Sequence, residues 1–174
     1  KAKVRGTPHN TGDGLNMALE LGAKKNGLYD GCHATPMDLY MKNYGGLDLE
    51  PRERKNYRKI CYFLGIMINA KGKRFLDEGK NFRNYTYAQY GRKVLEQPNH
   101  FAWQIFDSKV FDLLYEEYRF HDAHFVEAKS IDELIEKMDG VDKIQTKKTL
   151  VEFNNSVDLT TSFDPTILDG KSTK

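Results

Sequence analysis

The sequence has little of several features that would assign it quickly to a functional class. Only 2 of its 174 residues are cysteine, which predicts free thiols at Cys32 and Cys61 rather than a disulfide scaffold. No apolar run approaches the roughly 20 residues that a membrane helix needs. The formal net charge is only +2, too small to indicate a nucleic acid or a membrane as partner. What remains is a composition typical of a folded domain with one core.

A complete dinucleotide-binding fingerprint is also missing. That motif, GxGxxG, follows a strand and precedes an acidic residue by about 20 positions. The nearest match, residues 12–17, has the first two glycines but Met17 in place of the third. The strand and the acidic residue are also absent from the expected places. A full cofactor-binding domain is therefore not predicted within this chain.

Residues 11–23, TGDGLNMALELGA, instead contain a glycine turn that opens a helix, predicted over residues 12–25. The two glycines allow a ligand to approach the backbone closely, and the Thr and Asp can cap the first turn. Small and apolar residues at helical spacing predict one buried face, with Leu15, Ala18, Leu19 and Gly22. The positive end of the helix dipole suits an anion.

The rest of the chain predicts an α+β domain, because helices and strands alternate irregularly. Strands are expected near residues 31–39, 60–69 and 101–106, and a loop over residues 43–58. Helices are expected over residues 85–96, 110–118, 131–138 and 142–155. Ser130 is the expected N-cap of the third of these helices, with Glu133 completing a capping box.

Four motifs give the chain a family resemblance: VRGTPHNTGDGLNMALELGA, GCHATPMD, GKRFLDEGKNFRNYTYAQYGRKVLEQP and FAWQIFD. Together they resemble the flavoproteins of the fumarate reductase and succinate dehydrogenase family, and within it most closely the tricarballylate dehydrogenases. The resemblance covers residues 1–115 well and the remainder loosely. It implies an FAD-dependent oxidoreductase, cytoplasmic or held at a membrane by a partner. Such an enzyme dehydrogenates or reduces a small di- or tricarboxylate by hydride transfer and uses an electron acceptor that is not identified.

The resemblance also implies that the chain is a fragment, since it starts at Lys1 and lacks the fingerprint. Residues 1–25 are expected to be a remnant of the FAD-binding domain, and residues 26–160 the substrate-capping domain, with mixed helices and a small sheet. Residues 161–174 are expected to be a tail leading back to the FAD domain. Four residues of the glycine turn are the expected FAD contacts: Thr11, Gly12, Asp13 and Gly14. Most of the FAD site would lie elsewhere, so the fragment alone is expected to be inactive and to bind no FAD tightly.

Substrate binding and catalysis are assigned by the resemblance to two motifs. His33 and Thr35, in His-Ala-Thr-Pro, match a His-Pro-Thr of fumarate reductases that helps bind a substrate carboxylate, although the proline lies one residue later here. Arg83 follows the Arg-Phe-x-x-Glu segment and matches an arginine that transfers a proton, with one extra residue between them. A guanidinium also clamps a carboxylate through two hydrogen bonds, so both roles stand. Glu78 is expected to orient or pair a nearby arginine at the substrate site, or to form a plain surface salt bridge.

The residues by themselves leave other interpretations open. His33 alone is typical of a turn histidine, and Arg83 of a solvated arginine. His121 and His124 have metal-ligand spacing, but no further Cys or His is nearby, so no metal site is predicted. Tyrosines and basic residues alternate over residues 83–93, yet on a helix they would point to different faces, which disfavours a nucleic-acid platform. The alternative function is a non-catalytic binding or interaction module derived from the same family.

Overall fold

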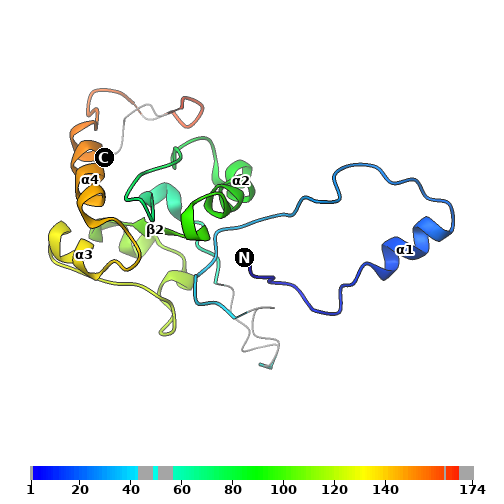
Figure 1. Cartoon of the computed structure of the whole chain (residues 1–174). Coiled ribbons are helices and arrows are strands. Elements are labelled where there is room, and N and C mark those ends of the chain that lie inside the picture. The colour runs from blue at the N-terminus through cyan, green and yellow to red at the C-terminus, as the bar shows by residue number, and fades with distance from the viewer. Residues whose placement is uncertain (1, 43–48, 51–56, 163, 169–174) are drawn as a thin grey trace.

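A computed structural model describes residues 2–42, 49–50, 57–162 and 164–168. An N-terminal arm, residues 2–35, extends away from the body of the molecule and carries helix α1 (Figure 1). The body combines helices with a small sheet, so the predicted α+β class is confirmed.

The sheet contains two antiparallel strands, β1 (Ile66–Asn69) and β2 (Ala102–Ile105). Every residue of β1 is buried, whereas those of β2 are half-buried. The expected strand over residues 60–69 is therefore only partly correct. Its first half is a 3-10 helix, η3 (Tyr62–Leu64), which places the Tyr62 hydroxyl in a buried hydrogen bond with Thr86.

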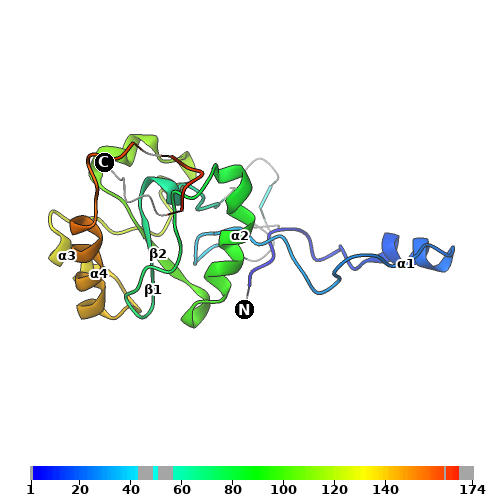
Figure 2. The ribbon, with the colours of Figure 1, turned by 90° about the horizontal axis from the view of Figure 1, so that it is seen from above.

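Helices cover β1 on both faces, and the alternation of its side chains explains how. Met67 points into a cluster with Tyr62 and Tyr90 of α2 (Arg83–Leu95). Ile66 and Ile68 point the other way, into a cluster with side chains of α3 (Ile131–Lys137) and α4 (Lys143–Asn155). Figure 2 shows α2 on one side of the strands and α3 and α4 on the other. The core is therefore a three-layer arrangement around β1.

The helix predictions for α3 and α4 are confirmed to within a residue, because local capping decides both. The Ser130 side chain accepts a hydrogen bond from Glu133 N at 3.2 Å, and Asp142 accepts one from Gln145 N at 2.9 Å. The Glu133 carboxylate reaches back to Lys129 N, one residue before the N-cap. Helix α2 begins two residues earlier than expected and ends before a 3-10 turn, η4 (Pro98–His100).

Two other sequence predictions are wrong. The helix expected over residues 110–118 is two 3-10 helices, η5 (Ser108–Leu113) and η6 (Glu116–Tyr118), separated by extended backbone at Leu114. This break buries Leu114 while the Tyr118 hydroxyl accepts a hydrogen bond from Cys61 N. The strand expected near residues 31–39 is reduced to a single bridge between Met37 and Arg58. Most of the loop expected over residues 43–58 lies outside the described residues.

Helix α1 (Asp13–Glu20) is shorter than predicted, and none of its residues is buried. Of the expected apolar face, Leu15 is 45% exposed, Ala18 and Gly22 are exposed and Leu19 is half-buried, so this face is not buried within the described residues. The Lys3 amine, near the start of the arm, donates to the carbonyls of Leu39 and Met41. The arm thus leaves the body and returns to it, with α1 at its far end (Figure 1).

Candidate functional site

The His-Ala-Thr-Pro segment lies directly against α2. A Cβ at Gly91 would lie 2.3 Å from the carbonyl carbon and oxygen of Ala34 and 2.5 Å from Thr35 N. Real Cβ atoms do not make such contacts with backbone, so the absent side chain of Gly91 is what admits the segment. Pro36, which follows, is buried. The position of His33 is therefore set by a close backbone approach that depends on one glycine.

His33 contacts the same helix one turn earlier. Its exposed imidazole packs edge-on against Tyr87, with ring centroids 5.2 Å apart and an interplanar angle of 67°. Tyr87 and Gly91 are four residues apart and therefore neighbours on the helix surface. The imidazole is thus held at its side while its outer face remains open to solvent.

Arg83 lies one further turn toward the start of α2. Its guanidinium donates to the Tyr115 hydroxyl and to Asn84 Oδ1, the latter at 2.9 Å, and lies 5.5 Å from the centre of the Tyr115 ring. Residues 83, 87 and 91 follow an i, i+4, i+8 spacing, so they form one row along α2, here called the α2 row. His33 packs against the middle of the row. The structure therefore brings His33 and Arg83 to one face of α2.

The electrostatics of the α2 row favour an anion. Arg83 is the first residue of α2, where the helix dipole contributes partial positive charge. The first turn of α2 contains no acidic residue. The row contributes the Arg83 guanidinium, and the exposed His33 imidazole packs against its middle residue; both kinds of group bind carboxylates.

Glu78 lies elsewhere, inside the body beneath β1. Its side chain is only 3% exposed, and it accepts hydrogen bonds from Met67 N at 2.6 Å and from Arg74 Nε at 2.7 Å. Burial raises the pKa of Glu78, while the Arg74 guanidinium opposes that rise. Both carboxylate oxygens are thus used to fix β1 and Arg74. Glu78 does orient an arginine, but that arginine is Arg74, and neither residue belongs to the α2 row.

The four expected FAD contacts lie on the arm. Gly12 has φ +90°, and a Cβ there would meet nothing within 4 Å, so this turn is open to a close neighbour. Thr11 Oγ1 donates to Asp13 Oδ2 at 2.9 Å. The Asp13 carboxylate already occupies the first turn of α1, where it would repel a phosphate. The turn is thus open at Gly12 and carries a carboxylate at the start of the helix.

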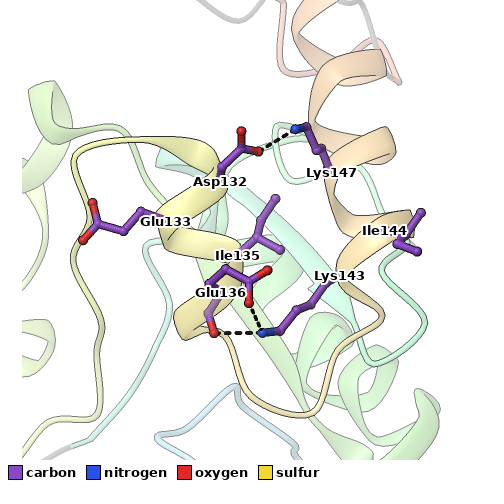
Figure 3. Close-up of a pocket in the computed structure, with 7 residues that line it drawn as sticks. All are labelled: Asp132, Glu133, Ile135, Glu136, Lys143, Ile144 and Lys147. Carbon is purple, nitrogen blue, oxygen red and sulfur yellow. Dashed lines mark hydrogen bonds and ion pairs between the residues drawn. The ribbon is translucent and has the colours of Figure 1, made fainter.

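Two hollows formed by described residues bear on the search for a site. The smaller, about 430 Å³, lies between α3 and α4, and its charges form ion pairs: Asp132 with Lys147 at 2.7 Å and Glu136 with Lys143 at 2.6 Å (Figure 3). These exposed pairs describe an ordinary solvated surface. The larger, about 860 Å³, lies beside β2. Sequence reasoning missed it, because the only signal is the density of aromatic residues in FAWQIF and HDAHF.

The two histidines with metal-ligand spacing are not placed together as ligands. His124 lies between two rings, with centroids 4.5 Å from Tyr40 and 5.5 Å from Trp103. His121 is exposed, 3.9 Å from an Asp122 oxygen. Within the described ranges, no group of three or more His, Cys, Asp or Glu side chains is arranged to hold a metal ion.

Comparison with known proteins adds no assignment. A scan against models of protein families finds no match, and a search of curated proteins finds no similar chain. Among the described helices, none has both the length and the apolar character needed to cross a bilayer. The structure defines a small α+β domain with a two-stranded sheet.

Proposed function

We propose that the chain is the substrate-capping part of an FAD-dependent oxidoreductase of the fumarate reductase and succinate dehydrogenase flavoprotein family. Its substrate would be a small di- or tricarboxylate, similar to tricarballylate, fumarate or succinate. The motifs of the sequence support this, and one structural observation carries it. His33 and Arg83, from motifs far apart in the chain, lie on one face of α2 because Gly91 admits the His-Ala-Thr-Pro backbone.

In this proposal the two residues bind and orient the substrate. Arg83 presents a planar fork that binds one carboxylate through two hydrogen bonds, and the Tyr115 ring and hydroxyl hold that fork in place. His33, which packs against Tyr87 of the same helix, binds a second carboxylate, and Thr35 lies two residues further along the same segment. FAD, when bound, accepts or delivers a hydride at the adjacent carbon. A guanidinium keeps its proton in proteins and is a poor proton carrier, so we assign the clamp as the first role of Arg83 and proton transfer as its second.

The exposed helix α1 on the arm is consistent with a surface on another domain that covers it. The exposed apolar side chains of α1 need a cover, and in this proposal the FAD-binding domain supplies it. Residues 11–14 would then touch one edge of FAD. The alternative function, a non-catalytic interaction module, would use the same arm to bind another protein. A flavin absorbance spectrum of the intact protein separates the two, since only the first predicts stoichiometric FAD.

The substitution Arg83→Lys, made in the intact flavoprotein, tests the role of Arg83. Lysine keeps the charge but loses the bidentate geometry. Loss of one such contact in the transition state is worth about 2.7–4 kcal/mol, so turnover should fall at least about a hundredfold. Flavin content and melting temperature should stay close to wild type. The measurement is steady-state turnover with the di- or tricarboxylate.

Arg92→Lys is the matched control, because Arg92 lies exposed near the end of the same helix. It should leave turnover unchanged. If Arg83→Lys also retains turnover within a few-fold of wild type, Arg83 is an ordinary surface arginine and the assigned role is wrong.

A further inference from the structure

The larger hollow is lined by no residue of the α2 row and is a candidate binding site in its own right. It has a volume of about 860 Å³ and lies between β2, residues 36–40 and residues 124–129, with the end of α3 along one side. This volume is within the range of pockets that enclose small organic ligands. Its lining comes from residues 36–40, Lys59, Met67, Val94 and parts of residues 100–118 and 124–140, so it is a product of the tertiary fold.

The lining is rich in aromatic rings. Six of them are Tyr40, Phe101, Trp103, Phe106, Tyr118 and Phe125. The His124 ring lies between two of these, 4.5 Å from one and 5.5 Å from the other. The faces of aromatic rings carry partial negative charge and attract cations as well as other rings.

The charged groups of the lining also favour a cation. Its acidic residues outnumber its lysines by five to three. Two of the lysines are already paired, Lys59 with Asp38 at 3.4 Å and Lys137 with Glu133 at 2.7 Å. Asp107, Glu127 and Asp139 then remain against a single lysine, so the lining has a net negative charge.

The most buried lysine is poorly placed to bind an anion. The Lys59 ammonium donates to the Glu117 carbonyl at 2.6 Å, pairs with Asp38, and lies 4.7 Å from the centre of the Tyr118 ring. Its donors are thus satisfied by the protein. A carboxylate entering the cavity would have to displace one of these partners and would meet the surplus of acids.

We propose that this cavity binds a small aromatic amine. The ring of the ligand would lie among the aromatic side chains, and its ammonium would face the surplus carboxylates. Cation–π attraction and charge act in the same direction here, which distinguishes this cavity from the anion-binding α2 row. The inference does not depend on the function proposed for that row, since no residue of the row lines the cavity.

The chain carries its own reporter for this site. Trp103 is the only tryptophan and lines the cavity, so its fluorescence should respond to an occupant. The titration uses phenylbutylamine, with phenylbutyrate and phenylbutanol as ligands of matched size and different charge. We expect a saturable change with the amine, and an affinity at least about tenfold higher than for the carboxylate, equivalent to about 1.4 kcal/mol.

Two variants locate the site. Phe125→Ala removes a ring that is 52% exposed, so folding should persist while the amine binds several-fold more weakly. Glu127→Gln keeps the backbone carbonyl that accepts from Lys137 and should reduce the preference for amine over carboxylate. Phe82→Ala is the matched control, since Phe82 is 64% exposed and lies outside the lining. Equal binding of the carboxylate, absence of saturation, or wild-type affinity in Phe125→Ala would each overturn the proposal.

Discussion

Gly91→Ala is the substitution that tests the geometry of the α2 row most directly. Gly91 is buried in the interior of α2, where alanine is the better helix former by about 1 kcal/mol. On helix propensity alone, the substitution should stabilise the protein. The structure predicts the opposite sign, because a methyl group at this position has no room.

The size of the effect follows from the contact distances. The new Cβ would lie 2.3 Å from the Ala34 carbonyl atoms, whereas ordinary contacts begin near 3.4 Å, so the segment must move by about 1 Å. It is anchored just beyond Pro36, whose carbonyl accepts from Lys59 N at 2.8 Å, and so cannot move freely. Overpacking of this kind costs about 1–3 kcal/mol. After the propensity gain, the free energy of unfolding should fall by about 1 kcal/mol.

Urea unfolding measures the stability, and the His33 ring resonances report the local geometry. We expect the resonances to lose the influence of the Tyr87 ring as the segment moves away. Gln89→Ala, at an exposed position of the same helix, is the control and should change neither measurement. If Gly91→Ala instead stabilises the protein by about 1 kcal/mol and leaves the His33 resonances unchanged, the segment does not contact α2 and His33 does not pack on the α2 row.

Three further predictions concern charge, capping and the arm. Because burial raises the pKa of Glu78, the folded state holds this proton more tightly than the unfolded chain does. The free energy of unfolding should therefore fall as pH rises from about 4.3 through the folded pKa. Glu78→Gln should flatten that part of a urea-monitored pH profile, while Glu96→Gln, at an exposed ion pair, should not. Asp142→Ala removes the N-cap of α4 and should lower the free energy of unfolding by about 1 kcal/mol in thermal unfolding, and an unchanged melting temperature would contradict the capping role. Amide hydrogens of residues 12–24 should exchange much faster than those of β1, and equal protection would show that α1 is docked.

The parts of the fold that sequence predicted are those that local chemistry decides. Ser130 and Asp142 cap their helices through bonds to residues three positions later, which a sequence pattern can reveal. The apolar run at residues 60–69 correctly indicated the buried strand β1 but not the 3-10 helix η3 that precedes it. In η3 the Tyr62 hydroxyl forms a hydrogen bond with Thr86, a residue distant in sequence, and no local pattern indicates that contact.

In the candidate site too, local sequence identified single residues, whereas contacts between distant residues decided how they are arranged. The motifs identified His33 and Arg83 individually, but their common face on α2 depends on the contact between Gly91 and Ala34, which no local pattern encodes. Glu78 was expected to orient an arginine at the substrate site or to form a surface salt bridge, and the structure buries it under β1, where it pairs with Arg74. The aromatic cavity was missed entirely, since its lining is assembled from distant segments.

The return of the arm to the body has a consequence for how α1 meets a partner. A free tail would sweep a large volume and lose much of its conformational entropy on docking. A segment closed at both ends, by Lys3 at one and by the packing at Gly91 at the other, has already lost part of that freedom. Its partner therefore meets a helix confined to a limited radius, and the entropic cost of ordering that helix is correspondingly smaller.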